Sequence, residues 1–274
     1  MILSLAAAGL ITYGVIKAHA GSTDLRKTPR PETYGNVVMD KTVKASAGVK
    51  PVVFSHWSHR TKYACRVCHT DQGGNSPIGF PLNANTVDIK QSDIEGGKFC
   101  GACHNGNTAF GPKECDKCHT SDLSSKKALF DNAVKDLPKD HFGNMVNWVV
   151  AAREQKIKPA HSLDGKGAPA PLDTDIVIPT VKFKPSPPDV LFPHKTHTEL
   201  LDCISCHAGI FQQKKGGNPD MNMMGIISGK YCGVCHGAVS FPLADCFRCH
   251  SQPVPPMAMP KMPAKDAIPA EKTK

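Results

Sequence analysis

Apolar residues recur with a regular spacing in only a few places along this chain. The first is Ile2–Ile16, a largely apolar stretch, shorter than the about 20 residues that a membrane-spanning helix needs. The triplet "AHA" at Ala18–Ala20 then forms a small-x-small cleavage site, and no positive charge precedes the apolar run. Residues 1–20 therefore predict an export signal, or an anchor if the segment is not cleaved. Residues 21–49 follow as an N-terminal extension.

The second regular pattern lies near the middle of the chain. Ser125–Lys156 predicts helix, interrupted by "LPKDHFGN" at Leu137–Asn144. An apolar stripe beside Trp148 is formed by Val146, Val149 and Val150. A Pro/Gly-rich stretch follows, so we expect residues 123–185 to be a helical and Pro/Gly-rich linker. The Pro- and Lys-rich residues 253–274 predict a disordered tail, and elsewhere we expect short helices, loops and at most a small hairpin near "DVLF".

All twelve cysteines fall in units of the form Cys-x-x-Cys-His. Two thiols three positions apart can add to the two vinyl groups of one haem, and the histidine that follows can bind its iron. The pattern therefore predicts six covalently bound c-type haems. The attachment residues are Cys65, Cys68, Cys100, Cys103, Cys115, Cys118, Cys203, Cys206, Cys232, Cys235, Cys246 and Cys249. The proximal iron ligands are His69, His104, His119, His207, His236 and His250.

Other chemistries of paired cysteines fit this pattern less well. A zinc ribbon pairs two Cys-x-x-Cys units per metal and needs no histidine after every second cysteine. A disulfide scaffold would not place all its cysteines at one spacing. A thioredoxin-like motif is expected once, near a βαβ pattern that is not visible here.

The six units belong to an internal repeat. "VVFSHWSH" (Val52–His59) matches "VLFPHKTH" (Val190–His197), and "GGKFCGACHNGNTAF" matches "SGKYCGVCHGAVSF". "ECDKCH" then matches "DCFRCH", so order, motifs and most spacings recur. We expect two three-haem modules, module 1 at residues 50–122 and module 2 at residues 186–252.

The motifs "FPHKTH", "CISCH", "CGVCH" and "CFRCH" resemble those of the triheme cytochrome c7 family, relatives of cytochrome c3. The resemblance implies a multihaem cytochrome c fold (class III, c7-like), a small, mainly helical and irregular structure wrapped around the haems in two repeated triheme modules. It also implies that His56 and His59 are the second axial ligands of the haems on Cys65/Cys68 and Cys100/Cys103. His194 and His197 would likewise serve those on Cys203/Cys206 and Cys232/Cys235.

Helical spacing agrees with this ligand assignment. Positions i and i+3 share one helix face, so a single short helix can hold two neighbouring haems. The alternatives are surface histidines or a zinc pair, and the recurrence ahead of both modules argues against them.

The third haem of each module departs from the family pattern. The family supplies a histidine just before the "GK" of the second haem motif, where this chain has Gly96 and Ser228. For Cys246/Cys249 we expect Met224, or Met223, as the axial ligand, unless these residues pack against a porphyrin face. For Cys115/Cys118 we expect His141, with His161 second, and an open five-coordinate haem is the alternative.

Composition and charge change the picture in two ways. The net charge of +9 favours an anionic partner, but six haems add about twelve propionates, so the holoprotein is near neutral and nucleic acid is not an expected partner. Only 6% of residues are aromatic, with 23 Gly and 23 Pro, which is poor material for a conventional core. We therefore expect the haems themselves to form the core.

Together these patterns predict an exported hexahaem cytochrome that transfers single electrons in anaerobic or extracellular respiration, and not an enzyme. We expect a periplasmic or extracellular location and redox protein partners, such as other cytochromes, quinol-oxidising complexes or outer-membrane conduits. An uncleaved N-terminus would attach it to a membrane. The alternatives are a multihaem reductase of a small oxyanion with an open haem, or a haem subunit of a membrane redox complex or filament. All six motifs end in His, which counts against the reductase.

Overall fold

The protein consists of short elements joined by long loops. The computed structural model describes residues 30–40, 48–70, 78–83, 85–120, 126–180, 187–207 and 209–252. The longest described helix, α5, has eight residues, and none of the described helices is long and apolar enough to cross a membrane. The predicted export segment and the predicted tail lie outside the described residues.

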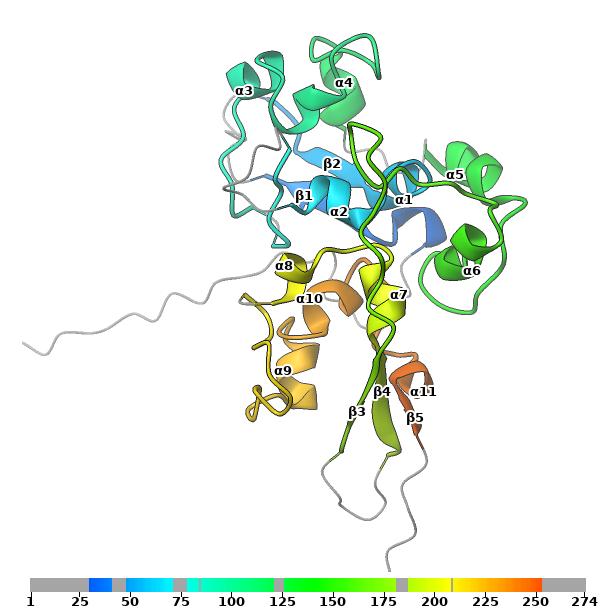
Figure 1. Ribbon diagram of the computed structural model, residues 1–274. Coiled ribbons are helices and arrows are strands. Elements are labelled where there is room, and N and C mark those ends of the chain that lie inside the picture. The colour runs from blue at the N-terminus through cyan, green and yellow to red at the C-terminus, as the bar shows by residue number, and fades with distance from the viewer. Residues whose placement is uncertain are drawn as a thin grey trace, which may run out of the picture.

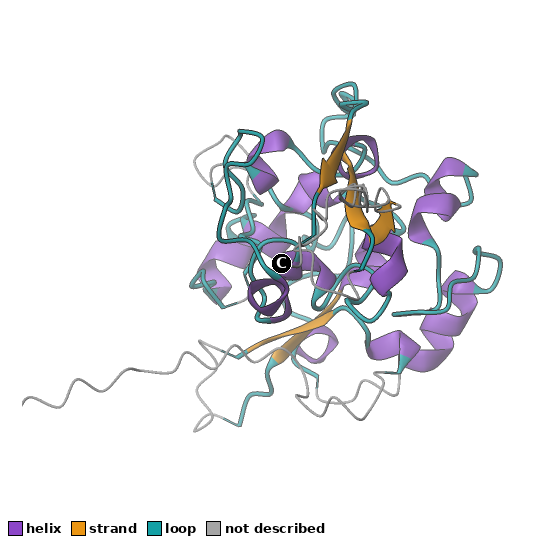
Figure 2. Cartoon of the chain, turned by 90° about the horizontal axis from the view of Figure 1, so that it is seen from below, coloured by secondary structure: helices purple, strands orange, loops and turns teal. Residues whose placement is uncertain are grey.

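The elements follow one another in the same order in both halves of the chain (Figure 1). They are η1 (Pro31–Thr33), β1 (Asn36–Met39), β2 (Val52–Ser55), α1 (His56–Arg60), α2 (Cys65–Cys68), α3 (Gln91–Glu95), η3 (Phe99–Ala102), α4 (Cys115–Cys118), α5 (Lys127–Val134), α6 (Trp148–Arg153), β3 (Asp175–Ile178), β4 (Asp189–Pro193), α7 (His194–Thr198), α8 (Cys203–Cys206), α9 (Met223–Ile227), α10 (Gly233–His236), α11 (Cys246–Cys249) and β5 (His250–Gln252). Figure 2 shows from below how loops connect these short helices and strands.

In each half, a small antiparallel sheet leads directly into the helix that carries the paired histidines. β1 pairs with β2, and α1 begins at the residue after β2. β3 pairs with β4 and β4 with β5, and α7 begins directly after β4. The histidine of the last cysteine motif joins each sheet, since His119 bridges Val52 and His250 pairs with Val190. Each half is therefore closed between its last motif and the strand that leads into its histidine helix, β2 or β4.

The second cysteine motif of each half is packed tightly under a short helix. A Cβ atom added to Gly101 would lie 1.8 Å from the Ile94 carbonyl oxygen, and one added to Gly233 would lie 1.8 Å from that of Ile226. No side chain fits there, so α3 and α9 contact the backbone of their motifs directly. This equivalence makes Ser92 in module 1 the counterpart of Met224 in module 2, each two residues before the isoleucine.

The main apolar cluster lies beside module 1 and uses the predicted linker. Trp57 of α1 packs edge-on against Phe130 of α5. The buried members are Trp57, Phe130, Val134, Leu137, Val146, Ala151 and Ile157. Residues of the linker therefore form the protein part of the core, while no large side chain in the described ranges is fully buried. This leaves much of each module without an apolar core of its own.

The two modules contact each other through their first cysteine motifs. Arg66, inside the first motif, reaches module 2 and is only 4% exposed. Its guanidinium donates to Asp202 Oδ1 at 2.7 Å, to the Thr198 carbonyl at 2.5 Å and to the Leu201 carbonyl at 3.1 Å. The Ser205 hydroxyl donates in return to the His69 carbonyl at 3.3 Å. The first haem motifs of the two modules thus lie together at the interface.

Candidate haem-binding sites

The cysteine pairs lie on short helical turns, where residues i and i+3 project from one side. Five of the six pairs lie on or overlap one-turn α-helices, and the Cys100/Cys103 pair lies on η3. All twelve thiols are free. In the described residues, no three of His, Cys, Asp and Glu converge on a common metal position. Each pair is thus presented as two separate thiols on a single turn.

Every histidine that ends a cysteine motif is oriented in the same way. Its Nδ1 lies within hydrogen-bonding distance of a backbone carbonyl oxygen, which can only accept. The pairs are His69–Phe80 at 3.0 Å, His104–Phe110 at 3.3 Å, His119–Lys50 at 2.6 Å, His207–Phe211 at 3.3 Å, His236–Phe241 at 3.1 Å and His250–Pro188 at 2.8 Å. Each Nδ1 therefore carries the proton, and each Nε2 has a free lone pair. This is the arrangement typical of metal-binding histidines.

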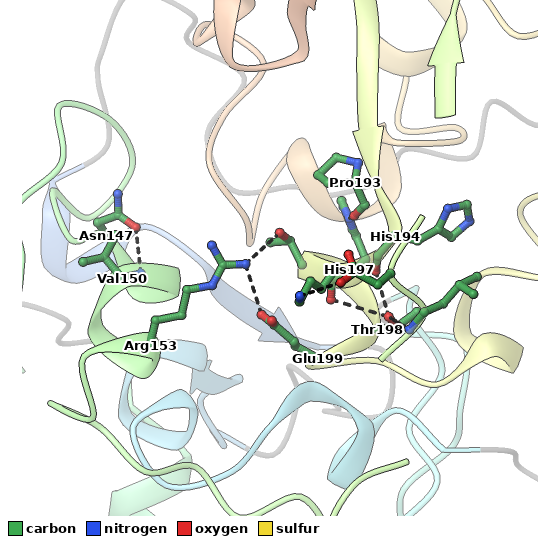
Figure 3. A network of polar contacts seen from close by, with 12 residues as sticks. Asn147, Val150, Arg153, Pro193, His194, His197, Thr198 and Glu199 are labelled. Atoms are coloured by element: carbon green, nitrogen blue, oxygen red, sulfur yellow. Dashed lines mark hydrogen bonds and ion pairs between the residues drawn. The ribbon is translucent and has the colours of Figure 1, made fainter. Parts of the chain in front are cut away.

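The paired histidines of α1 and α7 are held in a related way. His59 Nδ1 donates to the Ser55 carbonyl at 3.1 Å, and His197 Nδ1 donates to the Pro193 carbonyl at 2.8 Å. Figure 3 shows the hydrogen bond between His197 and Pro193, together with the Arg153–Glu199 ion pair that joins α6 to the end of α7. His56 Nδ1 donates to Gly35 at 2.7 Å. Three of the four predicted second ligands therefore also have Nε2 free.

A phenylalanine orients each pair. Phe54 stacks on His59 at 4.4 Å between ring centroids and contacts His56 edge-on at 4.9 Å. In module 2, Phe192 stacks on His197 at 4.4 Å and contacts His194 edge-on at 4.9 Å. The same aromatic contact thus fixes both histidine pairs.

Three second-ligand histidines face the motif histidine predicted to share their iron. The ring centroids are 6.4 Å apart for His56–His69, with the rings only 16° from parallel. They are 6.2 Å apart both for His59–His104 and for His197–His236. Two metal–imidazole bonds of about 2 Å would place the centroids about 6.3 Å apart. These three pairs therefore have the spacing that a shared iron requires.

The fourth predicted pair is less complete. No close ring contact joins His194 to His207 in the part of the chain that the structure describes, and His194 Nδ1 is buried without a hydrogen-bond partner. The backbone N–H of His194 donates to the Thr174 carbonyl at 3.0 Å. Its ring is thus the one member of the set whose tautomer no carbonyl fixes.

The residues predicted for the third haems lie in different surroundings. Met224 is on α9 and 72% exposed, and Met223 beside it is 45% exposed. His141 is exposed and follows Asp140, whose carboxylate binds Arg248 inside the last motif, at 2.7 and 2.9 Å. His141 therefore lies next to the last cysteine motif of module 2, and its assignment to the haem on Cys115/Cys118 stays a prediction.

His161 follows Ala160, which is bonded to Lys62 and Ala64 of module 1. Its Nδ1 is buried and has no hydrogen-bond partner. The structure places His161 next to the first cysteine motif, and no contact joins it to His119 in the described residues.

Burial sets the protonation of these sites. It lowers the pKa of His56 to about 4 and also lowers the pKa of His69, so both rings are neutral at pH 7, as metal ligands must be. Burial raises the pKa of the Cys68 and Cys235 thiols to about 12, with neighbouring cysteines adding to the effect. Without a haem, these thiols are therefore protonated and uncharged.

Neighbouring motifs are close enough to interact electrostatically, in the same order in both modules. In module 1 the interacting cysteines are Cys68 with Cys103, and Cys100 with Cys118. In module 2 they are Cys206 with Cys235, and Cys232 with Cys249. Cys65 and Cys235 interact in the same way across the modules. All six motifs are thus connected through neighbours, with the Cys232/Cys235 motif joined to three others.

A cavity of about 620 Å³ opens at the interface between the modules. Its walls include His69, Phe80 and Leu82 from module 1, and Ile204 and Tyr231 from module 2. The volume is in the range of cofactor pockets, and its walls mix apolar side chains with polar ones such as Asn83 and Lys230. The cavity adjoins a motif histidine, so the residues present fit a large flat cofactor at this point.

Two residues at the interface were missed by reasoning from the sequence. Arg66 is the first variable residue of its motif, where the other motifs have Gly, Asp, Ile, Gly and Phe. A long charged side chain in that place was an available signal. Arg60 donates to the Val239 carbonyl of module 2 at 3.3 Å. The sequence gave no signal for this contact, because an arginine at the end of a helix is ordinarily exposed.

Known proteins resemble both repeated halves. The family model of cytochrome c7 and related cytochrome c matches residues 52–120 and 190–252. A c7-type three-haem cytochrome domain is 36% identical and covers 31% of this chain and 93% of its own, with a TM-score of 0.26. The C-terminal hexahaem fragment of GSU1996 is 26% identical, covering 82% of this chain and 100% of its own, with a TM-score of 0.25. Dodecahaem cytochrome c GSU1996 is 23% identical, covering 79% and 73%, with a TM-score of 0.26. No curated protein matches the chain.

Proposed function

The chain belongs to the cytochrome c7 family, and on this basis we propose that it is an exported electron-transfer protein with six covalently bound haems. One observation carries the number six. All six motif histidines share the Nδ1–carbonyl hydrogen bond that leaves Nε2 free for iron. A motif that had lost its haem would have no need for this orientation.

In this proposal each cysteine pair holds one haem, and its motif histidine is the proximal ligand. His56, His59 and His197 are the second ligands of the haems bound by His69, His104 and His236, which their ring spacings support. We assign His194 to the haem of His207 by the repeat alone.

For the third haem of module 2 we retain Met224, which lies on α9. Its counterpart in module 1 is Ser92, so a methionine ligand at this place is available in module 2 alone. For the third haem of module 1 we keep His141 as the predicted second ligand, although it lies next to the last motif of module 2.

When bound, haem c exchanges one electron at its iron, and the protein determines the position and potential of each iron. The residues of this chain do the remaining work. Histidine ligands favour low potentials, the short motifs keep neighbouring haems close, and the Arg66 contact fixes the two modules against each other. This suits a carrier that accepts and releases electrons at its surface.

We place this carrier in the periplasm or outside the cell, in anaerobic or extracellular respiration. Its partners would be redox proteins, such as other cytochromes, quinol-oxidising complexes or outer-membrane conduits. The charge balance of the haem-loaded chain and its exported class support this context, and residues 1–20 would supply the export signal or an anchor.

The test is the haem-loaded protein itself. Expressed with a haem-attachment system, it should show a mass increase of six haems, and a potentiometric titration should need six electrons per chain. A Cys203→Ala, Cys206→Ala variant is the matched control and should lose one haem and one electron. A wild-type mass with fewer haems would refute the proposal, and so would turnover of nitrite or hydroxylamine at enzymatic rates.

A further inference from the structure

Arg60 lies at a second contact between the two modules. It is the last residue of α1 and directly follows His59. Its guanidinium is within electrostatic range of Cys65 in module 1 and Cys235 in module 2. One nitrogen donates to the Val239 carbonyl at 3.3 Å, and the guanidinium carbon lies 5.3 Å from the centre of the Trp148 ring. Arg60 thus joins both modules and the linker helix α6.

Arg60 is the one arginine in the described ranges that does not pair with a carboxylate. Arg30 binds Glu32, Arg66 binds Asp202, Arg153 binds Glu199, and Arg248 binds Asp140 and Asp245. The groups around Arg60 are the Val239 carbonyl, the Trp148 indole ring, the Tyr34 phenol and the side chains of Cys65 and Cys235, and none of them is a carboxylate. Arg60 is half-buried and has no carboxylate partner of its own, so this position is suited to a carboxylate that the polypeptide does not supply.

The repeat shows that this arginine is specific to the junction. His59 corresponds to His197, so Arg60 corresponds to Thr198 in α7. The Thr198 carbonyl accepts a hydrogen bond from Arg66 instead. A residue needed only to hold its own module would be expected in both copies.

We propose that Arg60 binds a propionate carboxylate of a haem at the junction, that on Cys65 or on Cys235, and so holds these two haems in a fixed relation across the modules. This inference rests on the proposed function, because haem supplies the anion. The guanidinium neutralises the carboxylate and adds positive charge beside the irons. Reduction then becomes easier, since the added electron is stabilised by a nearby cation. Arg60 therefore keeps the potentials of the two junction haems above the values that they would have without it.

The experiment uses the six-haem protein and the variants Arg60→Leu, Arg60→Lys and Arg153→Leu. Haem content is measured first by mass. A wild-type protein that lacks six haems refutes the proposed function, and the Arg60 inference is judged only on fully loaded protein. Potentiometric titration should show two of the six redox components shifted to lower potential in Arg60→Leu. Arg60→Lys should restore most of the shift, and Arg153→Leu, which removes an exposed pair with Glu199, should leave all six unchanged.

Resonance Raman spectra supply the second readout, since propionate bending modes respond to loss of a guanidinium partner. If Arg60→Leu does not load six haems, Arg60→Gln replaces it with the same expected result. The inference is overturned if the fully loaded neutral variant titrates like the wild type. An equal shift of all six components, or unchanged propionate modes, would overturn it as well.

Discussion

Replacing Arg66 tests how the modules are held together. Arg66→Met keeps the apolar stem but removes three hydrogen bonds that cross to module 2. A hydrogen bond to a charged group contributes about 1.5–3 kcal/mol. The two carbonyl bonds are buried with Arg66, whereas Asp202 is 37% exposed and is rehydrated after the change. We therefore expect a loss of about 3 kcal/mol, which makes separation of the modules about 150-fold more frequent.

The assay is urea unfolding of the haem-loaded protein followed by far-ultraviolet circular dichroism, with small-angle X-ray scattering of the native state. Arg66→Met should lower the unfolding midpoint and increase the radius of gyration. Arg153→Met is the control. Its ion pair with Glu199 also joins two segments, but Arg153 is 52% exposed, so the expected loss is about 0.5 kcal/mol. Equal losses for the two variants would show that the buried contact does not hold the modules together.

Three further outcomes follow from other contacts. Gly233→Ala places a methyl group 1.8 Å from the Ile226 carbonyl oxygen and should destabilise module 2 by about 3 kcal/mol in urea unfolding. Gly209→Ala is the control and should have no effect, because no atom lies within 4 Å of the added methyl group. Similar unfolding midpoints for the two variants would contradict the packing argument. Burial raises the pKa of Tyr34 from its ordinary value of 10.0 to about 12, so the unfolded chain loses this proton first. The unfolding free energy should therefore fall by about 1–2 kcal/mol as the pH rises from 10 to 12. Tyr34→Phe, compared at the same pH values, should abolish that fall. Met224→Ala should remove the methionine–iron charge-transfer band from the ferric spectrum and lower the reduction potential of one haem. Met223→Ala should leave the band and the potential unchanged. A band that survives Met224→Ala would exclude Met224 as the ligand.

Much of each module could be predicted because its information is local. Cysteines three apart lie on one helical turn, and His56 and His59 share a face of α1, so their partners followed from spacing and the family pattern. The ring pairs His56–His69 and His59–His104 agree with that assignment. These features need only a few neighbouring residues to form.

The junction could not be predicted in the same way. Arg66 and Asp202 are 136 positions apart, and nothing in either segment marks the other as its partner. Asp140 and Arg248 are 108 positions apart, and their ion pair places His141 beside the last motif of module 2. The linker was expected to be helical and Pro/Gly-rich, but its spacing did not indicate that Phe130, Val134 and Ala151 would be buried in one cluster with Trp57. Each of these contacts depends on how separately formed units pack, which residue spacing does not encode.

The carbonyl bonds of the last motif histidines also bear on how the protein is made. His119 bonds to Lys50, 69 positions earlier, and His250 bonds to Pro188, 62 positions earlier. A chain that crosses a membrane from its N-terminus exports the early member of each bond first. Fully extended, 69 residues span about 230 Å, so a long stretch of unfolded chain precedes formation of the His119–Lys50 bond that closes module 1. If the chain is exported and loaded with haem as proposed, the first two cysteine pairs of each module are accessible to the haem-attachment enzyme before the third arrives and closes the module.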